Sequence, residues 1–214
     1  MPSATSCATA ASPVRAYSYV VARDFGFAPN PFHGWCTLAA CKPRLRKSAQ
    51  PGDWVVGTGT GTKGRAGFLV YAMRVEEALA FDQYWRDPRF RRKRPDLRAS
   101  RKLSFGDNIY RRARDGSWRQ LPSHHSFHDG RANPANIATD TSVDRMLASR
   151  EFVYFGGSGP AIPGHLRKFG SDGEDLVIGG PHHKCCFSAE LVSASVAWIE
   201  SLPERGVVGR PGDW

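Results

Sequence analysis

Two adjacent histidines lie in a polar loop of this 214-residue chain, in the order Ser123-His124-His125-Ser126. Imidazole titrates near neutral pH, so a histidine pair flanked by hydroxyl groups suits general acid–base catalysis or phosphate binding. A surface loop with incidental histidines is the alternative interpretation. Neither histidine has a nucleophile beside it in the sequence, so this motif predicts no covalent mechanism.

A second candidate pair, Asp107 and Asn108, lies between aromatic residues in the segment FGDNIY. A carboxylate can orient a water molecule or accept from an amino group, and an asparagine amide can form two hydrogen bonds with an adenine edge. The alternative is a turn in which these side chains bond their own backbone. The functional interpretation makes Asp107 a catalytic candidate beside His124 and His125, and makes Asn108 a pocket residue.

The segment 24–33 combines aromatic rings with polar side chains, and its two prolines exclude a helix. Rings beside polar groups suit one wall of a pocket that stacks and hydrogen-bonds a base. The alternative is that the phenylalanines plug the end of the fold. The candidate pocket residues in this segment are Asp24, Phe25, Phe27, Asn30 and His33.

Cysteine and histidine residues at 182–186, in the order HHKCC, resemble a metal-binding tract, and His33, Cys36 and Cys41 add further ligand types. Zinc sites use cysteines two to four residues apart, and adjacent residues cannot easily share one ion. The pattern therefore favours reduced thiols and predicts no metal and no cofactor.

An odd number of cysteines argues against a disulfide framework and indicates the cytoplasm. The glycine-rich segments at 57–64 and 156–159 lack the spacing of phosphate-binding loops.

Basic residues concentrate in the middle of the chain. Twelve lysines and arginines between Arg86 and Arg114 face three aspartates, so this segment carries +9 of the net charge of +10. Arginine forks match phosphate oxygens, which predicts contact with a nucleic acid, DNA first, or with a nucleotide. A solvated charged loop is the alternative. The candidate phosphate-binding residues are Arg89, Arg91, Arg92, Lys93, Arg94, Arg98, Arg101 and Lys102.

The elements that must position these residues are mostly strands. β-Branched and aromatic residues predict a first strand at 16–24, and the segment 53–75 predicts a hairpin with a long glycine-rich tip. Apolar spacing predicts helices at 76–86, 142–150 and 188–202, and strands at 151–155 and 176–178, while 91–150 reads as mostly irregular. The strand–helix alternation of parallel sheets is missing. We therefore expect an α+β fold: a small mixed, largely antiparallel barrel of the PUA-like type, with few helices and a long polar insertion.

The chain length fits one domain, expected at 15–203, between a disordered leader at 1–14 and a loose tail at 204–214. No apolar run is long enough to span a membrane, and the first residues lack the features of a secretory signal.

Several blocks of sequence resemble, in order, the nucleotide modification associated domain 2 family. They are SYVVARDFGFAPNPFHGWCTLAACKPRLRKSA, GDWVVGTG, LVYAMRVEEALAFDQYWRDPRF, SFGDNIY and SHHS, and they span about residues 15–200. This resemblance implies a bacterial or phage protein that acts in DNA modification. A local second resemblance, in GDWVV, the glycine-rich tip and LVYAMRVEEAL before FDQYW, is to PUA-like barrels such as the EVE and YTH modules. Those modules hold a flipped base between aromatic side chains, and none of their cage residues transfers to a position here.

Three functions follow from the sequence. The first is a module that binds a modified base or nucleotide. The second is an enzyme acting on a base or nucleotide, such as a glycosidic-bond hydrolase or a transferase. The third is a scaffold subunit of a defence or modification system whose basic segment docks an acidic partner.

Overall fold

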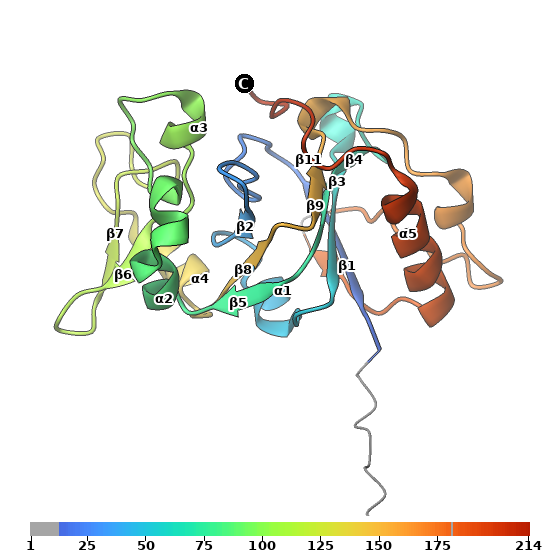
Figure 1. Ribbon diagram of the computed structural model, residues 1–214, viewed down its shortest axis with the longest axis horizontal. Helices are drawn as coiled ribbons and strands as arrows, with labels where there is room; N and C mark the ends of the chain where they lie inside the picture. The colour runs from blue at the N-terminus through green and yellow to red at the C-terminus, as the bar shows by residue number, and fades with distance from the viewer. Residues whose placement is uncertain (1–12, 181) are drawn as a thin grey trace, which may run out of the picture.

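The computed structural model describes residues 13–180 and 182–214, so the predicted leader lies outside the described residues except for its last two positions (Figure 1). The described part is an α+β fold with several mostly antiparallel sheets and few helices, as predicted. No helix in this part is both long and apolar enough to cross a membrane.

The largest sheet has six strands in the order β10-β1-β3-β4-β9-β11. Its strands are β1 (Ala16–Val21), β3 (Trp54–Gly59), β4 (Leu69–Arg74), β9 (Phe152–Tyr154), β10 (His183–Lys184) and β11 (Gly206–Val207). The predicted hairpin is confirmed, because β3 and β4 pair antiparallel and a 3₁₀ turn, η1 (Gly61–Lys63), forms part of their connection. β1 pairs parallel to β3, so both strands run toward the same edge as this hairpin tip.

A second sheet has the order β2-β8-β5, with β2 (Cys36–Leu38), β8 (Met146–Ser149) and β5 (Glu77–Leu79), and β6 (Tyr110–Arg112) pairs with β7 (Trp118–Gln120). The helix predicted at 142–150 is wrong, since β8 is the central strand of this sheet. All four residues of β8 are buried, and packing on both faces overrides local helix preference. The strand predicted at 176–178 is also absent, and these residues form bends beside the cleft described below.

The helices are α1 (Pro43–Ser48), α2 (Phe81–Arg86), α3 (Arg101–Ser104), α4 (Pro134–Asp140) and α5 (Ala189–Ser201), with 3₁₀ turns η2 (Pro88–Lys93), η3 (Gly156–Ser158) and η4 (Gly164–Leu166). The predicted closing helix is α5, which Ser188 caps by accepting a hydrogen bond from the N–H of Leu191. Leu191 and Ile199 pack with Trp54 and Val56 of β3, so α5 covers one face of the large sheet.

The residues from 80 to 140 form a lobe of their own, which we call the small lobe. Figure 1 shows α2, α3, β6 and β7 together on one side, with the large sheet and α5 on the other. Phe81, Tyr84, Phe90 and Tyr110 form the core of the small lobe. The insertion predicted as irregular therefore contains regular elements. In the part of the chain that the structure describes, the three sheets form no closed barrel, so the expected PUA-like barrel is not found.

The C-terminal tail, expected to be loose, packs against the segment after β1. The N–H of Asp213 donates to the carbonyl of Asp24 at 2.9 Å, and the indole N–H of Trp214 donates to the carbonyl of Phe25 at 2.9 Å. The Trp214 ring also stacks on Phe32, with ring centres 5.4 Å apart. The tail thus fixes the backbone that carries Phe25.

Candidate active site

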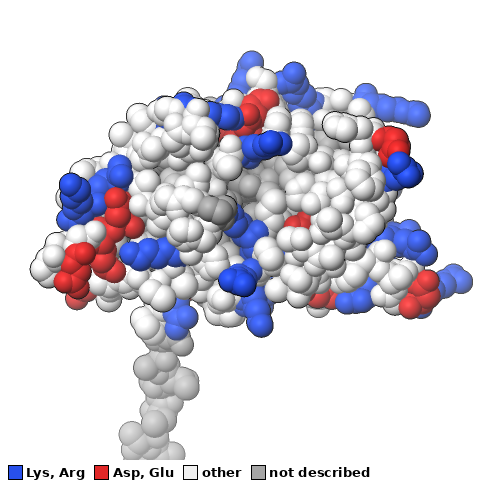
Figure 2. Space-filling model, turned by 180° about the vertical axis from the view of Figure 1, so that it is seen from behind, with Lys and Arg blue, Asp and Glu red and all other residues white. Residues whose placement is uncertain are grey.

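A cleft of about 1140 Å³ opens between the large sheet and the small lobe. Its walls come from the end of β1, the tip of the β3–β4 hairpin, the Cys41–Lys42 turn, the 123–130 loop and residues 177–180. Figure 2 shows the hollow near the centre of the rear face, with lysine and arginine side chains above and below it. Segments far apart in the sequence therefore meet at one opening.

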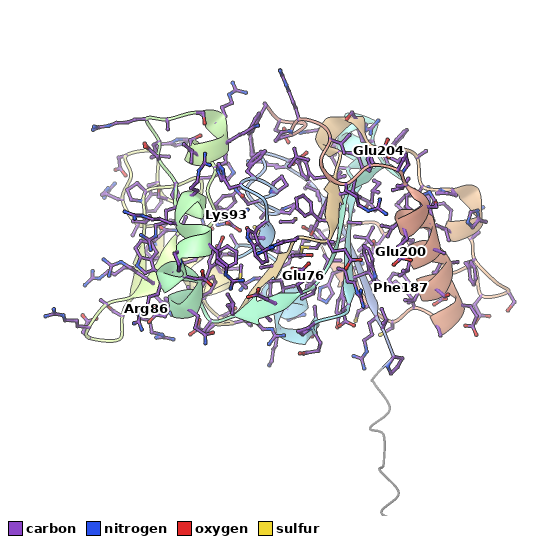
Figure 3. All side chains as sticks on the ribbon, viewed as in Figure 1. Glu76, Arg86, Lys93, Phe187, Glu200 and Glu204 are labelled. Atoms are coloured by element: carbon purple, nitrogen blue, oxygen red, sulfur yellow. The ribbon has the colours of Figure 1, made fainter. Side chains whose placement is uncertain are left out.

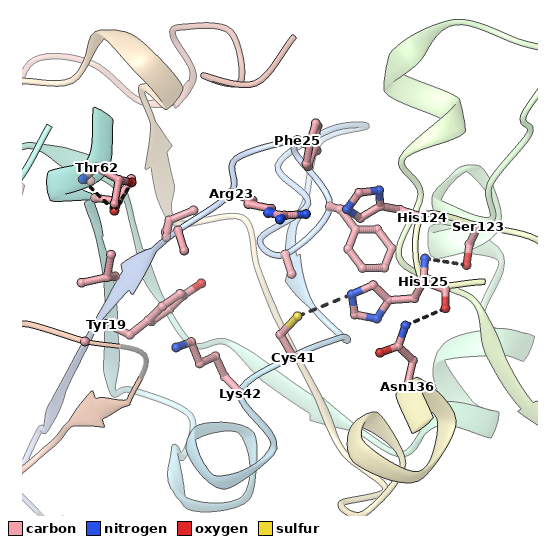
Figure 4. Close-up of a pocket in the computed structure, with 18 of the residues that line it drawn as sticks. Tyr19, Arg23, Phe25, Cys41, Lys42, Thr62, Ser123, His124, His125 and Asn136 are labelled. Atoms are coloured by element: carbon pink, nitrogen blue, oxygen red, sulfur yellow. Dashed lines mark hydrogen bonds between the residues drawn. The ribbon is translucent and has the colours of Figure 1, made fainter. Parts of the chain in front are cut away.

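A cysteine, a histidine and an aspartate form a hydrogen-bonded chain in this cleft. His125 donates from Nδ1 to Oδ2 of Asp140 at 2.7 Å, and its Nε2 lies 3.7 Å from Sγ of Cys41 (Figure 4). The side chain of Asp140 is 2% exposed and that of His125 is 17% exposed. This is the order of groups in a nucleophile–base–carboxylate triad, in which the carboxylate fixes the tautomer and orientation of the imidazole.

Several donors hold Asp140 in place at the last residue of α4. Its Oδ1 accepts from the backbone N–H of Cys41 at 2.7 Å, and its Oδ2 accepts from the hydroxyl of Tyr110 at 2.8 Å. The buried guanidinium of Arg46 donates to the carbonyl oxygens of Asp140 at 2.6 Å and of Cys41 at 2.9 Å. Arg46 therefore ties the backbone of Cys41 to that of Asp140.

Cys41 lies in a strained turn between β2 and α1. Its φ is 60° and that of Lys42 is 44°, both in the left-handed region that residues other than glycine seldom adopt. Such residues cost about 1–3 kcal/mol each and persist where the surrounding structure enforces them, often at functional sites. Here the hydrogen bond from the N–H of Cys41 to Asp140 is part of that enforcement.

The surroundings of His125 favour its charged form. Burial lowers the pKa of His125, but the hydrogen bonds with Asp140 and Cys41 and the charges of both outweigh it and raise the pKa to about 9. The imidazole is therefore positively charged at neutral pH. Both ring nitrogens then carry a proton, and Nε2 faces Sγ of Cys41.

Aromatic rings form the wall opposite the large sheet. His124 lies 4.7 Å from Phe25 and 5.3 Å from Phe27, measured between ring centres, and Phe25 stacks on Phe105 at 5.2 Å. Burial lowers the pKa of His124, and the charges of His125 and Arg23 lower it further. A neutral His124 therefore adds a further ring, inclined at 53° to Phe25 and at 64° to Phe27, to an aromatic wall against which a base can stack.

The charges of the cleft are of one sign. Among the described residues that line it, none is acidic, whereas Arg23 and Lys42 are basic. Figure 4 shows Lys42 next to Cys41, and Arg23 between the hairpin tip and His124. The Lys42 ammonium lies 4.8 Å from the centre of the Tyr19 ring, and burial lowers its pKa. A cleft with these charges suits an anionic ligand such as a nucleotide phosphate.

Of the residues predicted from the sequence, Phe25, Phe27, His124 and His125 line the cleft. Asp24 lies behind the wall, where its carboxylate accepts from the hydroxyl of Tyr154 and from the tail. His33 does not line the cleft either. The aromatic residues of the predicted pocket thus line the cleft, while Asp24 and His33 do not.

Asp107, Asn108 and Asn30 support the fold instead of the cleft. Asp107 is 1% exposed and accepts from the hydroxyls of Tyr84 at 2.6 Å and Thr37 at 2.8 Å. Asn108 donates to the carbonyl of Tyr84 at 3.0 Å, and Asn30 donates to the carbonyls of Gly26 and Phe105 at 2.9 Å. Asp107 is therefore buried away from the cleft, where a water molecule bound in the cleft does not reach its carboxylate.

The basic segment divides into two groups. Lys93 is buried and donates to Asn30 and Trp35, Arg89 pairs with Glu77 and Asp87, and Arg94 lies over the Trp85 ring. Figure 3 shows Lys93 inside the small lobe and Arg86 on its outer side. The side chains of these three predicted phosphate ligands already contact other groups of the protein. The exposed remainder is Arg91, Arg92, Arg98, Arg101 and Lys102.

Sequence reasoning missed Cys41 as a nucleophile and missed Asp140 altogether. The two residues lie 84 positions before and 15 positions after His125, so no local motif joins them. The sequence contains the three residue types of such a chain, but only the fold shows that these particular residues meet.

The same three side chains have the spacing of a metal site, with ligand atoms within 4.8 Å of one another. Both oxygens of Asp140 already accept hydrogen bonds, one of them from His125 itself. The thiol lies at Nε2 and the carboxylate at Nδ1 of the same imidazole ring, which is the order of groups in a triad. The donor set fits a triad better than a metal centre.

Comparison with known proteins identifies the family of the chain. Searches of curated proteins and of solved structures gave no match. The family described as nucleotide modification associated domain 2 matches residues 14–214, which include every residue of the cleft and the tail that supports it. The chain therefore belongs to the nucleotide modification associated domain 2 family.

Proposed function

We propose that this protein is an enzyme that modifies a nucleotide or a nucleic-acid base by covalent cysteine catalysis. Cys41 is the nucleophile, His125 is its acid–base partner, and Asp140 positions His125. The observation that carries the proposal is the place of His125, with Nδ1 on Asp140 and Nε2 facing Cys41 in a cleft. The match to the nucleotide modification associated domain 2 family is the reason to expect a nucleotide as substrate.

The reaction class that this arrangement supports is acyl or amide transfer. The Cys41 thiolate adds to a carbonyl carbon, forming the C–S bond while the carbonyl electrons move to oxygen. When the carbonyl re-forms, the bond to the leaving group breaks and the leaving group takes a proton from His125. Water or an amine then attacks the thioester and gives its proton to His125, and the thiolate leaves. The substrate is thus a nucleotide that receives or loses an acyl or amide group.

Glycosidic-bond hydrolysis receives less support. That reaction normally uses two carboxyl groups on either side of the bond, and no acidic residue is found among the described residues lining the cleft. Transfer of an acyl or amide group therefore fits the cleft better than hydrolysis of a glycosidic bond.

The ligand would bind at the aromatic wall, with Arg23 close to it. A base stacks on one ring of that wall, Phe25 or His124, and a phosphate meets Arg23 (Figure 4). Stacking is worth about 1–3 kcal/mol per base and tolerates any base, so the identity of the base would depend on other groups.

The experiment is a covalent-trapping assay. The protein is incubated with nucleosides and oligonucleotides that carry acylated or amidated bases, and intact-protein mass spectrometry follows adducts while nucleoside analysis follows products. We expect an adduct on Cys41 and no product with Cys41→Ser. The matched control is Cys186→Ser, which changes an exposed thiol outside the cleft. Equal product formation by Cys41→Ser and the unaltered protein would exclude the proposal.

A second candidate function, a module that only binds a modified base, is favoured by the aromatic wall of Phe25, Phe27 and His124. In that case Phe25→Ala weakens ligand binding, and no substrate gives a Cys41-dependent product.

A further inference from the structure

Two large apolar side chains are exposed at the mouth of the cleft. Leu97 is 55% exposed and Phe127 is 46% exposed, and both line the opening. They come from different segments, the connection between η2 and α3 and the loop that follows the triad histidine. The other large apolar side chains that the structure shows as exposed are valines away from the cleft, namely Val14, Val207 and Val208. The largest exposed apolar groups are therefore gathered where a ligand enters.

Cations without an ion pair surround Leu97 in the sequence. Arg91, Arg92, Arg98, Arg101 and Lys102 are exposed, and none of their side chains has an ion pair with another described residue. By contrast, Arg89 and Arg112 are paired with acidic residues. On the other side of the mouth, the guanidinium of Arg131 lies 5.8 Å from the centre of the Phe127 ring, but it pairs with Asp129. The cations without an ion pair therefore accompany Leu97.

The cleft lies at the upper end of the size range of single-ligand pockets and is open. Pockets for a single small ligand measure about 300–1000 Å³ and enclose most of it, whereas this cleft measures about 1140 Å³ and is open on the rear face (Figure 2). A ligand that ended inside the cleft would leave Leu97 and Phe127 in water. A ligand that continues past the mouth would cover them.

We propose that the substrate nucleotide is part of a single-stranded polynucleotide, whose neighbouring bases pack on Leu97 and Phe127. Apolar side chains of this kind stack on or wedge between bases, and the phosphates of the same strand contact the cations near Leu97. One nucleotide of the strand reaches the wall of Phe25 and His124, beside Cys41. This inference rests on the proposed function for the role of the cleft, but it concerns only the ligand.

The first test compares a strand with its own monomers. Fluorescence anisotropy measures the affinity for labelled single-stranded DNA and RNA oligonucleotides, and competition measures the affinity for the corresponding mononucleotides. The Leu97→Ser/Phe127→Ala variant is expected to lower the ratio of oligonucleotide to mononucleotide affinity by about tenfold or more, from the stacking of one or two bases. The control is Val208→Ser, which removes an exposed apolar side chain elsewhere and should leave the ratio within about twofold.

The second test uses salt. The Arg98→Gln/Arg101→Gln/Lys102→Gln variant is expected to reduce the slope of log affinity against log salt by about 2, since each single-strand phosphate contact contributes about 0.7. The control, Arg74→Gln/Arg114→Gln/Arg119→Gln, removes the same charge from residues outside the segment that flanks Leu97, and two of them, Arg74 and Arg119, form ion pairs with Glu151 and Asp115.

The outcomes are separable. The inference is overturned if oligonucleotides bind no more tightly than mononucleotides, if the two variants behave like their controls, or if a duplex of the same sequence binds as tightly as the single strand. Preference for DNA or for RNA supports it in either case and identifies the strand. Failure of Cys41 trapping with strand binding intact would remove the proposed chemistry alone, and trapping without strand preference would remove this inference alone.

Discussion

The backbone N–H of Cys41 donates a 2.7 Å hydrogen bond to Oδ1 of Asp140. The other oxygen of the same carboxylate accepts from His125 at 2.7 Å. Asp140 therefore holds both the strained backbone of Cys41 and the imidazole of His125. A change at Asp140 should affect thiol chemistry beyond any loss of stability.

Asp140→Asn should reduce the reactivity of Cys41. An amide carries no charge, so it stabilises the positive imidazole less, and the pKa of His125 should fall from about 9. The amide N–H₂ also cannot accept from Nδ1, which disturbs the tautomer. We expect the rate of Cys41 alkylation by iodoacetamide at neutral pH to fall about tenfold or more, with an altered pH profile. Tyr110→Phe, which removes one donor to the same carboxylate, is the control for a purely structural effect. An identical pH profile in Asp140→Asn would contradict the role of Asp140.

Stability should fall with rising pH through the titration of His125. The pKa of His125 is raised from 6.5 to about 9 in the folded protein, so the charged form is stabilised by folding. That stabilisation is complete below about pH 6.5 and is lost as the pH rises through 9. Its size is about 3 kcal/mol at most. Urea unfolding at a series of pH values measures it, and His125→Gln should flatten this part of the curve.

Elements with a local pattern were predicted correctly from the sequence. The hairpin of β3 and β4 has turn residues between two apolar runs, and α5 has regular apolar spacing after a serine cap. β8 was missed because its four buried residues have no alternation, and only its position between β2 and β5 makes it a strand.

The candidate site was predicted in part for the same reason. His124 and His125 are adjacent and conspicuous, whereas Cys41 and Asp140 join them only through the fold. Among the basic residues, composition could not distinguish a buried Lys93 from an exposed Arg98, because partners such as Asn30 and Trp35 come from a distant segment.

Trp214→Ala should weaken ligand binding from outside the cleft. Trp214 holds the carbonyl of Phe25 and stacks on Phe32, and the ring of Phe25 forms the cleft wall. We expect a loss of about 1–2 kcal/mol in the free energy of unfolding, and weaker binding of oligonucleotides and mononucleotides alike. Trp198→Ala, in α5 on the far face of the sheet, should lower stability without changing affinity. Denaturant unfolding and anisotropy measure the two effects, and equal affinity in both variants would exclude support of the wall by the tail.

Asp107→Asn should destabilise the protein without affecting thiol chemistry. The carboxylate of Asp107 accepts from Tyr84 and Thr37, and it is the main charge that opposes burial in setting the pKa of Lys93, which is lowered to about 8. An amide in place of the carboxylate removes the charge that opposes burial of Lys93 and leaves one of the two hydroxyl donors without its acceptor, which costs about 1–3 kcal/mol. In conditions where the variant remains folded, Cys41 should be alkylated at the rate of the unaltered protein, because Asp107 does not line the cleft. Asp107→Asn and Asp140→Asn make the same chemical change, so the two variants form a matched pair. We expect Asp107→Asn to lower stability and leave the alkylation rate unchanged, and Asp140→Asn to lower the alkylation rate beyond its effect on stability. This result would distinguish a carboxylate that maintains the fold from one that orients His125.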